Sequence, residues 1–313
     1  MILVLTVTIP IFVVIIAGFV SAKRGFMSRD SIKAFTSFVF YFCLPLMLFQ
    51  SLANAPVAEQ FRGNYVLAYL SAGLTTFVIG YAVARWIFKC TVGEQTVQGL
   101  AVSFGQTVFM TIPIGLALYG ESSVLPIALL ISIEMGVIVP LAIVLLEIEN
   151  GGRNNFKSAA RTAFRTIFIN PIVLSILLGV GVALLELKPP AVLDGIVNLV
   201  RGATIPCALY AIGASLAGLS FSERMKETGF MAISKLLLYP FMVFIFMSMF
   251  SGIPSEWSNI AIIAAATPIG ASVYLVASTY NTYVERTSAA TLVSTVFAVV
   301  TLSILVIIFN PAG

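Results

Sequence analysis

Ten long apolar runs follow one another along the chain, separated by short stretches of charged, glycine or asparagine residues. Each run has about the 20 residues that a helix needs to cross the hydrocarbon core of a bilayer. The pattern therefore predicts ten transmembrane helices and an all-α polytopic membrane protein. Their approximate bounds are residues 2–21, 32–54, 64–88, 97–118, 123–147, 167–186, 193–218, 229–251, 257–279 and 287–309.

The composition agrees with the membrane interpretation and excludes a soluble enzyme. Of 313 residues, 59% are apolar and 10% are charged, whereas a soluble domain has about 45–50% and about 25%. The chain has no histidine, which excludes histidine triads and the usual zinc ligand sets. Cys43, Cys90 and Cys207 are too scattered for a disulfide framework or a metal knuckle. We expect no metal and no cofactor, apart from H⁺ or Na⁺ as a coupling ion.

Basic residues are divided unequally between alternate loops, and this division predicts the orientation. One set of loops and adjoining helix ends carries fourteen of the 17 basic residues, and the other carries only Arg62, Lys188 and Arg201. Because the basic side stays in the cytoplasm, both termini are predicted to face outward. Orientation also accounts for the net charge of +4, so nucleic acid is not expected as a partner.

A shift of 161 residues superimposes landmarks of the two halves. It places Pro10 on Pro171 and Pro45 on Pro206. This predicts a first five-helix repeat over residues 1–148, a cytoplasmic linker over 149–166 and a second repeat over 167–313. Five spans is an odd number, so the second repeat enters the membrane inverted, as in carriers that bind substrate near the bilayer midplane.

The fourth span of each half contains a helix breaker flanked by polar side chains. Proline removes a helical hydrogen bond, and irregular backbone survives in a bilayer only inside protein or beside a watery cavity. We therefore expect two broken helices whose half-helix starts face one anion-binding cavity. An ordinary proline kink, with hydroxyls bonded back to carbonyls, is the alternative. The candidate substrate-binding residues are Gln106, Thr107, Thr111 and Pro113 in span four, and Thr267, Pro268, Ser272 and Tyr274 in span nine.

Two of the ionisable residues that fall inside predicted spans are candidates for function. Glu134 lies in the middle of span five, where an ionised carboxylate is costly unless it is paired, hydrated or protonated. It is the candidate for coupling to a proton or sodium ion, and a packing carboxyl bonded to Ser132 or a lysine is the alternative. Lys235 lies several residues into span eight, where it either extends to the interface or serves as a cation partner of Glu134.

The chain resembles the auxin efflux carrier family in its bacterial, malate and malonate permease-like branch. The matching segments are Leu44–Ala53, Ile112-Pro113-Ile114 with Tyr119-Gly120, Lys235 with Pro240, and Pro268 with Ala277 and Tyr280. Gln50 and Ser51, within the first of these, join the candidate substrate-binding residues.

The resemblance implies ten helices in an inverted-repeat fold similar to sodium/proton antiporters and bile-acid symporters. Crossed helices four and nine would hold a carboxylate in an elevator-type mechanism. Such families usually have an asparagine in each crossing helix, where this chain has Gln106 and Ser272. A different or smaller acid, or a non-anionic solute, is therefore an open alternative.

The sequence thus predicts a secondary carrier of a small organic anion, a mono- or dicarboxylate, in the cytoplasmic (inner) membrane of a bacterium. A passive channel or facilitator and a non-transporting sensor are the alternatives, and a homodimer stays open. An enzyme is not expected, because HExxH, GxSxG, P-loop and paired-carboxylate motifs are missing from the sequence. The expected partners are the lipid bilayer and the anion.

Overall fold

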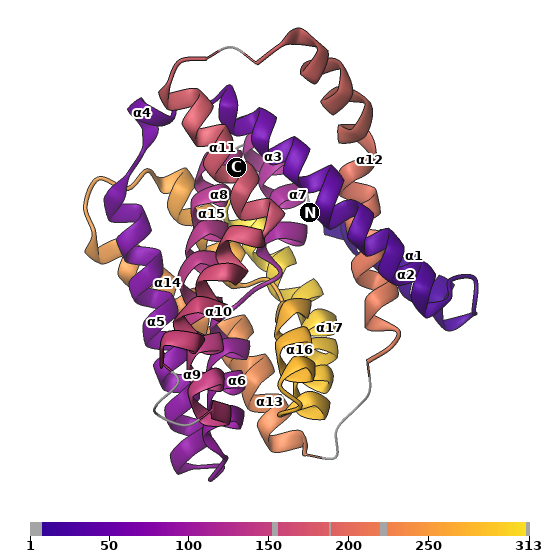
Figure 1. Ribbon diagram of the computed structural model, residues 1–313, viewed down its shortest axis with the longest axis vertical. Coiled ribbons are helices and arrows are strands. Elements are labelled where there is room, and N and C mark those ends of the chain that lie inside the picture. Colours follow the sequence, from indigo (N-terminus) through magenta and orange to yellow (C-terminus); the bar gives the residue numbers. More distant parts are fainter. Residues whose placement is uncertain (1–7, 152–155, 188, 220–223, 311–313) are drawn as a thin grey trace.

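The computed structural model describes residues 8–151, 156–187, 189–219 and 224–310, and these residues form helices and no strand (Figure 1). In a bilayer a helix satisfies its own backbone hydrogen bonds, so an apolar sequence of this kind folds as helices. The α-helices are α1 Ile9–Lys23, α2 Arg29–Phe38, α3 Leu44–Ala53, α4 Val57–Gln60, α5 Gly63–Trp86, α6 Val92–Ser103, α7 Ile112–Tyr119, α8 Val124–Ile133, α9 Val139–Gly151, α10 Phe156–Ile169, α11 Pro171–Leu184, α12 Ala191–Leu216, α13 Met225–Ile233, α14 Tyr239–Met249, α15 Ser255–Ala265, α16 Ala271–Thr279 and α17 Val284–Ile308.

Several of these helices are joined end to end by π-helical turns. The turns are Val39–Cys43, Thr107–Thr111, Glu134–Ile138 and Ser234–Leu238, and a 3₁₀ turn covers Gly120–Ser123. Single π turns inside longer helices are frequent at functional sites. Both ionisable candidates, Glu134 and Lys235, lie in such turns.

Six helices in the described part of the chain are long and apolar enough to span a membrane, or seven if the bent pair α10–α11 counts as one span. The polytopic membrane protein is therefore confirmed. One of the six is the 43-residue run Thr107–Glu149, whose length suffices for about two crossings and which turns at Gly120 with a φ of 65°. The remaining predicted spans are short: α1 has 15 residues, and α6 and α15 end at breaks.

The helices pack in two groups. α1, α3, α11 and α12 contact one another closely, and α5, α6, α9 and α13–α17 form the second group (Figure 1). Small residues let backbones approach within the first group, as is common in membrane helices. A Cβ atom at Gly213 of α12 would lie 1.8 Å from the carbonyl oxygen of Ile15 in α1. Between the groups, contacts run mainly through α8 and the π turn Thr107–Thr111, with further contact where α10 lies against α9.

The predicted linker, residues 149–166, overlaps the end of α9 and most of α10. Lys157, Arg161 and Arg165 therefore belong to a helix, and residues 152–155 lie outside the described ranges. The division into two repeats stays a prediction.

The predicted orientation can be tested with single cysteines in a background lacking Cys43, Cys90 and Cys207. Lys226 and Arg62 are both exposed and belong to opposite sides in the loop-charge prediction. A membrane-impermeant maleimide added to intact cells should label R62C and leave K226C unlabelled until the cells are opened. The reverse pattern would contradict the predicted orientation.

Candidate functional site

The two broken helices meet at their breaks. α6 ends at Ser103 and helix resumes at Thr107, while α15 ends at Ala265 and α16 begins at Ala271. Between these ends, Gly105 and Ile269 form an isolated antiparallel bridge. The amide of Gln106 donates to the carbonyl of Pro268 (3.0 Å), and the amide of Gly270 donates to the carbonyl of Phe104 (3.3 Å). We call residues 104–106 and 266–270 the crossing; it satisfies backbone groups that the breaks leave without helical partners.

Glycine makes the close approach of the two chains feasible. A Cβ atom at Gly270 would lie 2.4 Å from the Phe104 ring and 2.7 Å from the carbonyl oxygen of Gly105. One at Gly105 would lie 2.5 Å from the hydroxyl of Thr267.

Pro113 is not at the break. It lies in the first turn of α7, behind the π turn Thr107–Thr111. Helix continues from this π turn into α7, and a local π adjustment is one way in which a membrane helix accommodates the hydrogen bond that proline removes. In span four the break therefore falls at Gly105, whereas in span nine Pro268 lies within the break.

Glu134 lies beside the crossing and is 1% exposed. Its Oε1 accepts hydrogen bonds from Tyr69 of α5 and from Thr107, each at 2.8 Å. Its Oε2 is buried and has no hydrogen-bond partner among the described residues. Ser132, a suggested packing partner, instead donates to the carbonyl of Ala128.

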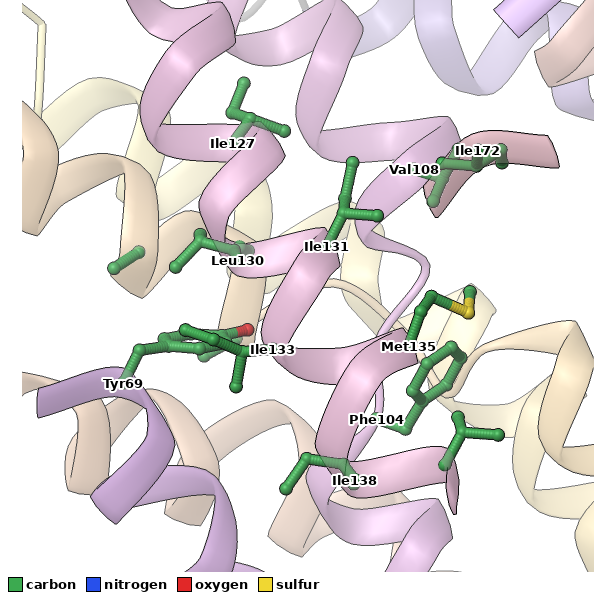
Figure 2. Close-up of a cluster of buried hydrophobic side chains, with 14 of the residues drawn as sticks. Tyr69, Phe104, Val108, Ile127, Leu130, Ile131, Ile133, Met135, Ile138 and Ile172 are labelled. Carbon is green, nitrogen blue, oxygen red and sulfur yellow. The ribbon is translucent and has the colours of Figure 1, made fainter. Parts of the chain in front are cut away.

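Apart from these two hydroxyl donors, apolar side chains line the helix around Glu134. Figure 2 shows Leu130, Ile131, Ile133 and Met135 around the helix that carries it, with Tyr69 beside this helix. An ionised carboxylate gains little from such neighbours, so the free oxygen of Glu134 is suited to hold a proton or to contact a small cation.

Lys235 is fully buried, so it does not extend to the interface. Its Nζ donates to the carbonyl of Ala265, the last residue of α15, and lies 5.0 Å from the centre of the Tyr239 ring. A Cβ atom at Gly105 would lie 3.1 Å from this Nζ, which places the ammonium group against the crossing. Among the described residues no ion pair joins Lys235 to Glu134.

The other polar candidates of spans four and nine lie at or next to the crossing. Gln106 is 5% exposed, and its side-chain oxygen accepts the amide of Ala271 at 3.4 Å. Thr267 donates to the carbonyl of Ala264 at 2.7 Å, and the buried hydroxyl of Thr111 has no partner among the described residues. Ser272 and Tyr274 lie on α16 and are partly exposed.

Gln50 and Ser51 belong to a separate hollow. They line a cavity of about 350 Å³, together with Asn54, Glu121 and Ser122. Gln50 donates to Asp194 of α12 (2.7 Å), and Ser51 donates to Glu121 (3.4 Å). We call this cavity the Gln50 hollow; it lies between α3 and the turn that precedes α8, and Glu121 is the carboxylate in its lining.

Sequence reasoning missed several residues that support these groups. Tyr69 holds Glu134, and the hydroxyl of Ser294 in α17 accepts the amide of Ile269 at 3.1 Å. Tyrosine and serine in apolar runs carry no periodic signal, so only proximity in space identifies them.

A second polar group, which the sequence analysis also missed, joins α6, α13 and α17. Arg286 pairs with Glu94 (2.8 Å) and Glu227 (2.9 Å), and Tyr283 donates to Gln98 (2.8 Å) and Glu227 (3.0 Å). We call these five residues the Arg286 network. Burial, with the nearby Cys90 and Glu227, raises the pKa of Tyr283, so its phenol remains a neutral donor.

The described residues contain no group of three or more Cys, Asp or Glu side chains that could hold a metal ion. The chemistry that the crossing offers is hydrogen bonding, one buried carboxyl and one buried amine.

Comparison with known proteins gives matches over nearly the whole chain. A family model described as "Membrane transport protein" matches residues 3–306. The "Putative malonate transporter" of Rhizobium meliloti (strain 1021) is 26% identical over 295 residues, which cover 94% of this chain and 92% of the relative. The "Uncharacterized transporter YfdV" of Escherichia coli (strain K12) is 27% identical over 304 residues, covering 94% and 93%. The "Uncharacterized transporter MJ1031" of Methanocaldococcus jannaschii is 19% identical over 310 residues, covering 95% and 96%.

Proposed function

The chain belongs to the membrane transport protein family, the auxin efflux carriers, and from this we propose that it is a secondary carrier of a small organic anion. The observation that carries the proposal is the crossing, where two broken helices meet beside Glu134 and Lys235. A mono- or dicarboxylate is the substrate class. The name of the Rhizobium relative supports that class.

The fold proposed for this function is a ten-helix inverted repeat. The 161-residue shift carries the start of α5, Gly63, to position 224, and α13 starts at Met225. It carries the start of α8, Val124, to position 285, and α17 starts at Val284. The same shift pairs α1 with α11, α6 with α15 and α7 with α16, which supports a division near residues 149–166.

An elevator-type movement fits the two helix groups. The crossing, Glu134 and Lys235 all belong to the group of α5, α6, α9 and α13–α17 together with α7 and α8. The group of α1, α3, α11 and α12 is held by backbone approaches at small residues, as expected of a scaffold. The crossing would move past this scaffold as a unit and open alternately to each side.

The anion would bind at the starts of the two half-helices. The first amides of a helix have no acceptor within it and carry partial positive charge. Gln106, Thr107 and Ser272 lie at these starts, and the buried ammonium of Lys235 lies close by. These groups together suit a carboxylate.

Glu134 is the proposed coupling residue. An inside-negative potential opposes uptake of an anion by about 2.3 kcal/mol per charge per 100 mV. Uptake therefore needs a co-transported cation, whereas efflux can proceed without one. A proton or sodium ion would bind at Oε2 of Glu134, which has no hydrogen-bond partner among the described residues.

The Glu134→Gln variant should fold and lose proton coupling. The amide oxygen of glutamine can still accept from Tyr69 and Thr107, whereas the side chain can no longer take up a proton. In proteoliposomes, a gradient of one pH unit should let the unaltered protein accumulate radiolabelled carboxylate about tenfold, if one proton is coupled. In E134Q the ratio of inside to outside concentration should fall to about one. The matched control is E59Q, which neutralises an exposed carboxylate on α4 and should keep the full response. An unaltered pH response in E134Q would exclude the coupling role.

Flux measurements also separate the carrier from its alternatives. A carrier should show counterflow and saturation with malonate or another small carboxylate, a channel should show conductance without counterflow, and a sensor should bind without flux. Thermal-shift screening of the purified protein against dicarboxylates, aromatic acids and amino acids identifies the acid to use. Binding without any flux would overturn the proposal.

The proposed location is the cytoplasmic membrane of a bacterium, with both termini outside. The unequal distribution of basic residues between loops supports it.

A further inference from the structure

The helix α10 carries arginines and aromatic rings together on its exposed side. Arg161 and Arg165 are exposed, as are Phe164 (62%) and Phe168 (47%). The two phenylalanine rings lie 4.2 Å apart, centre to centre, and form one continuous apolar surface. The guanidinium groups need a polar or anionic environment, whereas the phenyl rings need an apolar one. The surroundings of this face must therefore provide both.

The opposite side of α10 is already occupied. Ala159 and Ala163 are buried, and α10 packs against α9. At 100° per residue, the arginine pair lies about 60° around the helix from the phenylalanine pair, and both pairs face away from the alanines. The exposed face is therefore one surface with a basic and an aromatic half.

The position of α10 in the chain places this face at a membrane boundary. α10 precedes the apolar α11 and is bent from it by 63°. Asn170 stabilises the bend, because its side-chain oxygen accepts the amides of Ile172 (3.0 Å) and Val173 (3.4 Å) at the start of α11. The Cα–Cβ bonds of a helix tilt toward its N-terminus, so the side chains of Arg161 and Arg165 leave α10 in the direction away from α11.

We propose that this face binds the headgroup of an anionic phospholipid, with Arg161 and Arg165 on the phosphate and the lipid chain along Phe164 and Phe168. Arginines four residues apart on one helix face are about 5–6 Å apart at Cβ, and each guanidinium forms paired hydrogen bonds to phosphate oxygens. α10 contains no acidic residue. The surface is therefore net positive and should favour an anionic lipid over a zwitterionic one.

The cytoplasmic leaflet supplies such lipids, and basic residues near it contribute about 1 kcal/mol each. That figure corresponds to about fivefold in affinity per arginine, or about 30-fold for the pair. This inference concerns a surface away from the crossing and stands whether or not the substrate proposal is correct.

Lipid binding to the purified full-length protein can be measured by native mass spectrometry with phosphatidylglycerol and phosphatidylcholine. Phosphatidylglycerol should bind more tightly to the unaltered protein, and R161Q/R165Q should lose about 30-fold in its affinity while phosphatidylcholine binding stays constant. The control R29Q/K33Q removes the same charge from α2, which continues in line into its span. This variant should keep most of the difference in affinity between phosphatidylglycerol and phosphatidylcholine. F164A/F168A should weaken both lipids.

Further measurements keep the test decisive. Raising the salt concentration should weaken phosphatidylglycerol binding to the unaltered protein, which needs no variant to fold. Glycerol phosphate should compete poorly, since it lacks the chain that packs on the rings. Equal affinity for the two lipids, or equal loss in the control, would overturn the proposal. So would a change from dimer to monomer in R161Q/R165Q with lipid affinity unchanged, because a second copy would then cover the face.

Discussion

Replacing Gly270 by alanine should abolish substrate flux and lower the melting temperature of the purified protein. The new methyl group would lie 2.4 Å from the Phe104 ring and 2.7 Å from the carbonyl oxygen of Gly105, so the two chains of the crossing must separate. Overpacking of this kind costs about 1–3 kcal/mol. Separation also breaks the hydrogen bond from Gly270 to Phe104. Flux in proteoliposomes and thermal unfolding in detergent measure the two effects.

The matched control for this experiment is Gly136→Ala. Gly136 lies two residues beyond Glu134 in the same π turn, and, apart from its chain neighbours and the adjacent backbone of its own helix, no atom lies within 4 Å of the position its Cβ would take. This variant should keep both flux and melting temperature. A G270A variant with normal flux would show that close contact at the crossing is not required for transport.

Replacing Arg286 by glutamine should produce the largest loss of stability outside the crossing. The Arg286 side chain is 15% exposed, and its partner Glu227 is 8% exposed. Removing one member of a buried pair leaves an uncompensated charge and costs about 3–5 kcal/mol. We expect the lower end of this range, about 3 kcal/mol, because Glu94 is 23% exposed and Glu227 keeps both its hydrogen bond from Tyr283 and its pairing with Arg224 at 3.5 Å. Thermal unfolding in detergent measures it.

A double-mutant cycle gives the pair's own contribution. E227Q/R286Q removes both charges and should recover part of the stability lost in R286Q. The control is Arg62→Gln, since Arg62 is exposed and, among the described residues, its side chain donates to the nearby carbonyls of Glu59 and Phe61. It should change stability by less than about 0.5 kcal/mol. Equal losses in R62Q and R286Q would mean that the Arg286 network does not hold α6, α13 and α17 together.

The candidate site was predicted in part. The residue types of the crossing are visible in the sequence: Gln106, Thr267 and Pro268 lie in it, and Thr107 follows it directly. In span four Pro113 is the strongest local helix-breaking signal, whereas the break lies at Gly105. A proline inside a continuing helix and a proline at a break look alike without the neighbouring chain.

Gln50 and Ser51 illustrate a second limit of sequence reasoning. They are candidates for substrate binding because a family-like segment contains them, and in the structure they line the Gln50 hollow and contact Asp194 and Glu121. A motif indicates that a chain is related to a family. Its distance in space from another motif depends on how the helices pack, which the motif does not show. Substrate contact at Gln50 and Ser51 stays a prediction.

The sequence by itself determined that this protein is helical and lies in a membrane, because hydropathy and backbone hydrogen bonding act on each segment locally. It also placed the carboxyl group of Glu134 in the middle of a membrane-spanning segment. Only the tertiary structure decided that Tyr69 and Thr107 share one oxygen of Glu134, that Lys235 donates to Ala265, and that Arg286 joins three helices. These contacts connect residues far apart in the chain, and their partners are chosen by packing between helices, which leaves no period in the sequence.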